Sequence, residues 1–316
     1  MNRIFIILLS IFLFACEDEH EIKIDYNGND TIPAIIKKTL PKNPDTLRIL
    51  GIGNSFTDDA MAYIPNFLSA AGINNVILGK LSYMACSLSQ HAAFYNRNSP
   101  AYNFQKSTKN KWETISTGYS LEGAIKNEPW DIIIFQQVSQ NSGMYDTFQP
   151  HLNYLINSMN NDCYNKDVLF GWHMTWSYSS NSKHSGFKNY GNDQNIMYQK
   201  IVDSVKAMME EIDIDEDLII PSGTAFQNLR NTSVNNPPLD LTRDGYHADL
   251  GVGRYILAYT WYQTLVAPCF DNLPPIENSF KTHLGFIPVT DSNYKMCQEA
   301  VHQSCKNKFE VVGVSN

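Results

Sequence analysis

Three residues that together can cleave an ester occur near opposite ends of this 316-residue chain. Ser55 follows an apolar run at 47–52 that has the length of a short buried strand. A serine hydroxyl becomes a nucleophile only when a base takes its proton and a third group orients that base. His247 follows Asp244 by three residues, so the two form a compact pair. We therefore predict Ser55 as nucleophile, His247 as general base and Asp244 as the residue that orients it.

Two other interpretations of the same stretch compete with this one. Gly51 and Gly53 could open a nucleotide-binding turn, but Phe56 occupies the place of the third glycine and no acid follows near residue 73. Nucleotide binding is therefore disfavoured. Ser55 could also merely cap the helix that begins near Asp58, as serines before helices commonly do. The pair formed by Asp244 and His247 favours the nucleophile.

Alternating strands and helices predict how these residues are positioned. The apolar pattern predicts strands at 47–52, 76–81, 130–136, 168–173 and 218–221, and helices at 60–71, 121–127, 151–159, 195–212 and 255–265. Such an alternation indicates an α/β fold with a central parallel sheet and helices on both faces. Ligands bind such sheets beyond the carboxyl ends of the strands, which is where Ser55 is expected.

Four short blocks resemble a known family of hydrolases. They are Gly53–Phe56, Cys86–Leu88 with His91, Phe135–Ser139 and Arg243–His247. In this order they resemble the DUF4886 group of the SGNH (GDSL-type) hydrolase superfamily, over about 47–265. The resemblance implies an SGNH/flavodoxin-like three-layer sandwich and supports the same three catalytic residues.

The resemblance also implies an oxyanion hole. The backbone N–H groups of Ser55 and Ala85 and the side chain of Gln136 would hold the oxyanion, with Gln137 as the alternative to Gln136. Many relatives have glycine in the second block where this chain has Ala85. A backbone donor survives that change if the dihedral angles permit it.

Four further side chains are candidates for contacting a substrate: His91, Gln137, His173 and Trp176. Aromatic faces at a strand end suit stacking on sugar rings, although His173 and Trp176 could simply pack in the core and His91 could be a surface residue. The histidines have no ligand spacing typical of zinc, so we expect no metal and no cofactor. The formal net charge of −8 argues against nucleic acid as a partner.

The N-terminus predicts export and lipidation. Residues 1–15 have a basic start and an apolar run of the length of a signal peptide, and Leu13–Cys16 resembles a lipobox in which Cys16 is lipidated. Polar residues 16–45 would form a tether, and 46–316 a single SGNH hydrolase-like domain. We expect the lipid on Cys16 to be the chain's membrane contact, in a bacterial envelope, at the outer membrane and exposed on the surface.

These observations together predict a serine hydrolase that cleaves carboxylic esters. Surface lipidation, the aromatic residues and the family resemblance favour O-acetylated carbohydrate as the substrate. The alternative is a non-catalytic glycan-binding surface lipoprotein on the same scaffold, with Ser55 as a helix cap.

Overall fold

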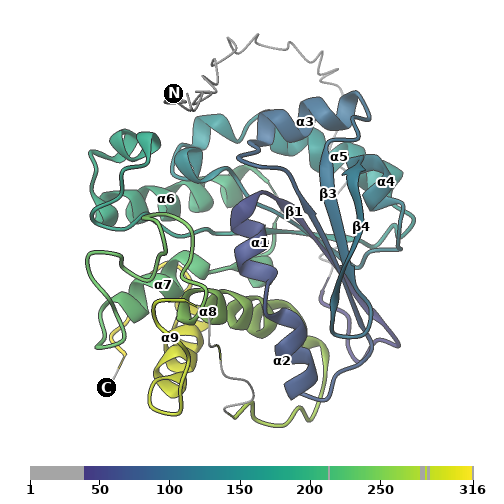
Figure 1. The fold of residues 1–316 in the computed structure, drawn as a ribbon. Coiled ribbons are helices and arrows are strands. Elements are labelled where there is room, and N and C mark those ends of the chain that lie inside the picture. Colours follow the sequence, from purple (N-terminus) through teal and green to yellow (C-terminus); the bar gives the residue numbers. More distant parts are fainter. Residues whose placement is uncertain (1–38, 213, 278–281, 283–284, 315–316) are drawn as a thin grey trace, which may run out of the picture. The chain divides into compact units, whose positions relative to one another are not determined.

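A seven-stranded sheet runs through the computed structural model in the order β4-β3-β2-β1-β5-β6-β7 (Figure 1). Its strands are β1 Leu47–Gly53, β2 Val76–Ser82, β3 Tyr102–Ser107, β4 Trp112–Tyr119, β5 Ile132–Phe135, β6 Leu169–His173 and β7 Ile219–Ile220. The structure describes residues 39–314 except 213, 278–281 and 283–284. The predicted signal peptide, Cys16 and most of the predicted tether therefore lie outside the described residues.

Five of the strands form the parallel sheet that the sequence predicts. β1 pairs in parallel with both β2 and β5, and β6 pairs in parallel with β5 and β7. The order of these five strands, second-first-third-fourth-fifth along the chain, is that of flavodoxin-like sheets. In this order the strand sequence reverses between β1 and β5, and the ligand crevice lies at their carboxyl ends. The predicted α/β class is confirmed.

An antiparallel hairpin at one edge was not predicted. β3 pairs antiparallel with β2, and β4 pairs antiparallel with β3. The two strands are polar, and most of β4 is exposed, so they lack the apolar pattern on which the prediction of the other strands depended. The central part of the sheet is thus parallel as predicted, and the antiparallel hairpin extends one edge of it.

Helices cover the two faces of the sheet in two groups (Figure 1). One group packs around α8 and the other packs around α5. The helices are α1 Ser55–Met61, α2 Ile64–Ala70, α3 Leu88–Asn96, α4 Leu121–Ile125, α5 His151–Asp162, α6 Gln194–Glu211, α7 Ser222–Arg230, α8 Val252–Trp261 and α9 Tyr294–Lys306. The helix predicted at 60–71 is in fact two helices, α1 and α2, with Pro65 in the first turn of α2, where a proline is tolerated.

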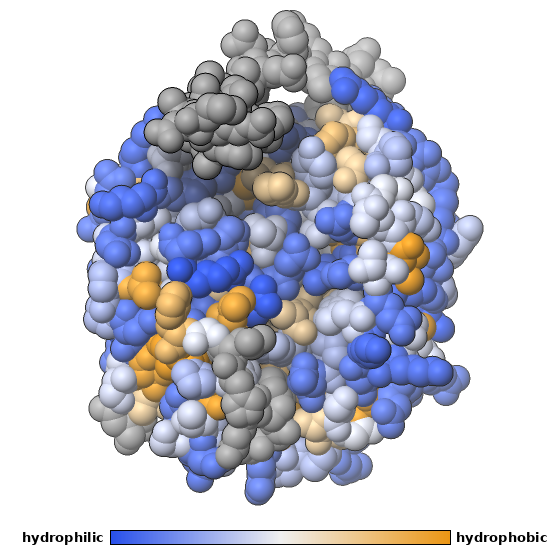
Figure 2. Space-filling model, viewed as in Figure 1, coloured by the Kyte–Doolittle hydropathy of each residue, from blue (hydrophilic) through white to orange (hydrophobic). Residues whose placement is uncertain are grey.

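The end of the predicted tether is bound to the folded domain. The amide of Asn43 donates to the carbonyl of Cys269, and its side chain donates to Asp271. Ordered structure therefore begins before residue 46. Within the described residues no helix combines the length and the apolar character needed to cross a bilayer. On the face in Figure 2, hydrophobic residues form separate patches within a mostly hydrophilic surface.

Close packing at Gly53 fixes the turn that carries Ser55. A Cβ atom at this position would overlap Thr57 Oγ1 and lie 2.8 Å from Gln136 Cγ. Both neighbours are buried, so neither can move away without disturbing the core.

We predict that Gly53→Ala lowers the free energy of unfolding by about 1–3 kcal/mol, the usual cost of overpacking a core. Urea unfolding measures this change. Gly118→Ala is the control, because a Cβ there meets its nearest atom at an ordinary 3.4 Å. Equal stability of the two variants would contradict the packing argument.

Candidate active site

Ser55 lies at the start of α1, directly after the turn that ends β1. Asn54, not Ser55, caps this helix: its Oδ1 accepts the amide of Phe56 at 3.0 Å. The hydroxyl of Ser55 is therefore not needed for capping. The helix-cap interpretation of Ser55 is wrong.

The structure brings Ser55, His247 and Asp244 into one hydrogen-bonded chain. His247 Nε2 lies 2.9 Å from Ser55 Oγ, and His247 Nδ1 lies 2.6 Å from Asp244 Oδ2. The other oxygen of Asp244 accepts the amide of His247 at 2.8 Å. Base and orienting acid are thus held in one short loop, and the base reaches the nucleophile at hydrogen-bond distance.

The hydrogen bonds that Asp244 accepts keep it ionised. Burial would raise its pKa, but the hydrogen bonds from the ring and the amide of His247 outweigh this effect and hold the pKa below its usual range. An ionised Asp244 accepts a proton-bearing Nδ1, which leaves Nε2 of the neutral ring free to accept the proton of Ser55.

Aromatic packing fixes the loop that carries His247. The ring of Tyr246 lies 4.3 Å from that of His247, centroid to centroid. Trp176 donates its indole N–H to the carbonyl of Tyr246 at 2.8 Å and stacks on Phe56 at 4.1 Å. Trp176 is fully buried, so its predicted role as a substrate contact is not supported. It supports the catalytic loop instead.

A buried ion cluster joins the Ser55 helix to the same loop. Asp59, fully buried and one helical turn after Ser55, accepts Arg243 Nη1 at 2.9 and 3.0 Å. It also accepts Arg254 Nη2 at 2.7 Å and the amide of Ala248 at 3.1 Å. Arg243 and Ala248 directly flank the segment from Asp244 to His247. We call these four groups the Asp59 cluster.

Asp59 is assigned no role in the sequence analysis. A signal was present: Asp59 follows Ser55 by four residues, which places both on one face of a helix. An arginine next to Asp244 was the matching signal in the other block.

Two backbone N–H groups are available for an oxyanion. The Ser55 amide belongs to the first turn of α1, where amides have no partner within the helix. Ala85 is exposed and has a φ of +54°, a conformation usually left to glycine. Its amide donates to no acceptor in the part of the chain that the structure describes. The alanine thus adopts the backbone conformation that glycine would favour.

The side chains of Gln136 and Gln137 are engaged in buried hydrogen bonds to other residues. Gln136 is buried, donates to Asn54 Oδ1 at 2.8 Å and accepts from Thr57 at 2.8 Å. Gln137 is also buried and donates to the carbonyl and hydroxyl of Thr147. The prediction that Gln136 or Gln137 supplies an oxyanion donor is therefore not supported, nor is the alternative role of Gln137 as a substrate contact. Gln136 holds Asn54, and through it the start of α1.

His91 and His173 are fully buried and do not reach a substrate either. His91 Nδ1 lies 2.7 Å from Tyr102 Oη, and His173 bonds Ser222 Oγ at 2.9 Å. Burial lowers the pKa of each histidine to about 3, so both are neutral at pH 7. Their predicted roles as substrate contacts are corrected to packing roles.

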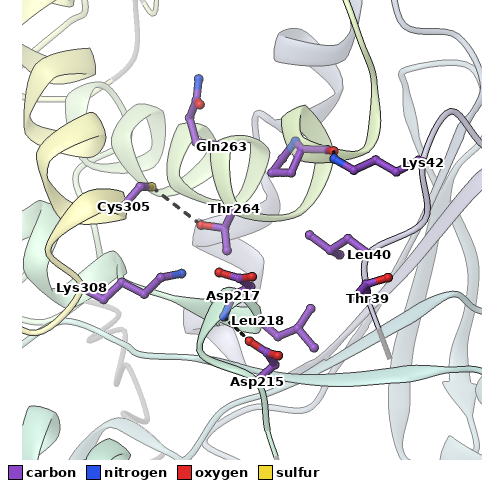
Figure 3. Close-up of a pocket in the computed structure, with 11 residues that line it drawn as sticks. Thr39, Leu40, Lys42, Asp215, Asp217, Leu218, Gln263, Thr264, Cys305 and Lys308 are labelled. Atoms are coloured by element: carbon purple, nitrogen blue, oxygen red, sulfur yellow. Dashed lines mark hydrogen bonds between the residues drawn. The ribbon is translucent and has the colours of Figure 1, made fainter. Parts of the chain in front are cut away.

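A pocket of about 580 Å³ lies away from these residues (Figure 3). Asp215, Asp217 and Leu218 line it, and they directly precede β7. The pocket therefore lies at the amino ends of the parallel strands, whereas Ser55 follows the carboxyl end of β1. Among residues 39–314, apart from the undescribed gaps, no group of His, Cys, Asp and Glu side chains is arranged to hold a metal ion.

Fold and site together define a three-layer α/β protein with a Ser–His–Asp constellation at the switch point of its sheet. The chain belongs to the family DUF4886, described as a domain of unknown function, whose model matches residues 48–304. The predicted family membership is confirmed.

Several solved structures resemble this chain. A DUF4886 protein from Bacteroides uniformis ATCC 8492 is 35% identical, with 85% of this chain and 98% of that chain covered and a TM-score of 0.73. A catalytic mutant of Axe2, an acetylxylan esterase from Geobacillus stearothermophilus, is 13% identical, with 75% of this chain and 99% of that chain covered and a TM-score of 0.49. No curated protein matches the chain significantly.

We predict that Asp59→Asn lowers kcat for a small ester by more than tenfold while KM changes little. The substitution removes the charge that aligns the two catalytic segments and leaves two arginines without their partner. It should also lower the free energy of unfolding by about 3 kcal/mol, the lower end for a broken buried pair, because the arginines are partly exposed. Asp203→Asn, on the exposed face of α6, is the control. An unchanged kcat would show that the cluster does not position the site.

The buried histidines predict a loss of stability in acid. The unfolded chain takes up protons on these rings as the pH falls below about 6.5, while the folded chain resists until about 3. The contribution of these two rings to the free energy of unfolding should therefore be complete above pH 6.5 and decrease as the pH falls below that value. His91→Phe should reduce the slope between pH 6.5 and 5 by up to about 1.4 kcal/mol per pH unit in urea unfolding. An unchanged slope would contradict the assignment of His91 as a buried neutral ring.

Proposed function

We propose that this protein is an SGNH-type serine esterase that removes O-acetyl groups from carbohydrate. The observation that carries the proposal is the unbroken hydrogen-bonded chain from Ser55 Oγ through His247 to Asp244. A hydroxyl bonded to an imidazole that is itself bonded to a carboxylate is the arrangement that activates a serine for acyl transfer.

The proposed reaction has two halves. Ser55 Oγ attacks the ester carbonyl as its proton passes to His247 Nε2, and the ionised Asp244 stabilises the imidazolium. The amides of Ser55 and Ala85 stabilise the oxyanion. The tetrahedral intermediate then releases the sugar hydroxyl, which takes the proton from His247, and leaves Ser55 acylated. Water, deprotonated by His247, attacks the acyl-enzyme in the same way and releases the carboxylic acid and Ser55.

Fewer observations support carbohydrate as the substrate than support ester cleavage. Trp176 no longer contributes to it, because its ring is buried. The supporting feature is the Ser- and Asn-rich segment 179–192, which packs against the catalytic loop and offers polar groups to a sugar. We further propose, from the lipobox at Leu13–Cys16, that a lipid anchors the chain in the cell envelope. The non-catalytic alternative loses its premise, since Asn54 caps α1 and the Ser55 hydroxyl bonds to His247.

An active-site fluorophosphonate probe tests the proposal directly. We expect it to label the wild-type protein and the Ser89→Ala control, and to leave Ser55→Ala unlabelled. Asp244→Asn should lower the turnover of p-nitrophenyl acetate on the order of 10³- to 10⁴-fold, because it removes the carboxylate that fixes the tautomer of His247. Absence of both labelling and turnover in the wild type would refute the esterase.

A further inference from the structure

A second pocket, of about 520 Å³, is formed by the segment that packs against the catalytic loop. We call it the 180–192 pocket. Its lining residues all come from one polar stretch of chain: Ser180, Asn181, Ser182, Lys183, His184, Ser185, Phe187, Lys188 and Asn192. Hydroxyl, amide and amine groups therefore dominate the lining.

Direct contacts connect this pocket to the catalytic residues. The amide of Ser179 donates to the carbonyl of Gly245 at 2.9 Å, within the segment from Asp244 to His247. The ring of His184 lies 4.9 Å from the ring of Tyr246, and the ring of Tyr246 lies 4.3 Å from that of His247. A single aromatic ring thus separates the pocket from the general base. A ligand in the pocket would therefore lie next to the loop that carries the general base.

The pocket is basic although the chain is acidic. Lys183 and Lys188 line it and no carboxylate does, in a chain whose formal net charge is −8. Neither lysine forms an ion pair with any described residue.

The nearby acids are already engaged. Asp240 accepts the amide of Ser180 at 2.8 Å and also accepts the side chain of Gln194. Asp244 is held by His247. Neither acid is paired with Lys183 or Lys188, so the two amines remain available to a ligand.

His184 presents a defined hydrogen-bond donor. Its Nδ1 accepts the amide of Gly186 at 3.0 Å, so a neutral ring carries its proton on Nε2. Burial lowers the pKa of His184, which favours the neutral ring. Its Nε2–H donates to no described residue and can serve a hydroxyl or an acidic group of a ligand.

We propose that the 180–192 pocket binds an acidic sugar, bearing a uronate or a sulfate, next to the acylated sugar in the substrate. Lys183 and Lys188 would neutralise the acidic group, and His184 with the neighbouring hydroxyls would bind the ring. This inference rests on the proposed esterase function and names its substrate class. It makes the pocket a determinant of specificity that acts on KM and not on the chemical step.

Matched substrates test the proposal. Acetylated glucuronoxylan oligosaccharides are compared with the same material after its carboxyl groups have been reduced to alcohols. We expect a KM about tenfold lower for the acidic substrate with the wild-type protein. The double variant Lys183→Gln/Lys188→Gln should lose this difference and keep the wild-type rate on p-nitrophenyl acetate. Lys109→Gln, at an exposed residue between β3 and β4, should behave as wild type.

Binding to the Ser55→Ala variant separates this inference from the esterase proposal, because it needs no turnover. Calorimetry with non-acetylated glucuronoxylan and with sulfated oligosaccharides should detect binding that the two lysine substitutions weaken about tenfold, and the stronger ligand identifies the acidic group. Equal binding of acidic and reduced oligosaccharides, or no effect of the lysine substitutions, would overturn the inference even if p-nitrophenyl acetate is hydrolysed.

Discussion

The geometry of the site depends on one buried carboxylate. Asp59 has no exposed surface and accepts donors from both sides of the loop that carries Asp244 and His247. Since Asp59 also lies one turn from Ser55 on the same short helix, its position sets the distance between two segments almost two hundred residues apart. A buried charge is costly unless it is fully paired. The Asp59 cluster is therefore stable only in the arrangement in which the two arginines and the amide all contact Asp59.

A second buried polar network supports the turn that carries the nucleophile. Asn54 caps α1, donates to the carbonyl of Cys86 at 3.1 Å and accepts Gln136 at 2.8 Å. Gln136 in turn lies 3.2 Å from His173. These buried groups connect the ends of β1, β5 and β6 with the segment that carries Ala85. The polar residues at these strand ends thus hold the site in place.

The sequence was sufficient for the parts of the structure that depend on periodicity and on local spacing. The five parallel strands follow from apolar runs, and the pairing of Asp244 with His247 follows from their separation of three residues. Burial in the tertiary structure could not be deduced in the same way. A glutamine or tryptophan at a strand end can face the crevice or the core, and only the packing of Phe56 and Asn54 decides between them. The polar hairpin of β3 and β4 had no apolar signal and was missed for that reason.

The chain enters the folded domain on the side opposite the catalytic residues. Thr39, Leu40 and Lys42 lie with Asp215 and Leu218 at the amino ends of the strands, while Ser55 follows the carboxyl end of β1. Seven residues of extended strand place about 23 Å between these two ends. If the proposed lipid holds the chain by its N-terminus, the point of attachment and the catalytic residues therefore lie at opposite ends of the parallel strands.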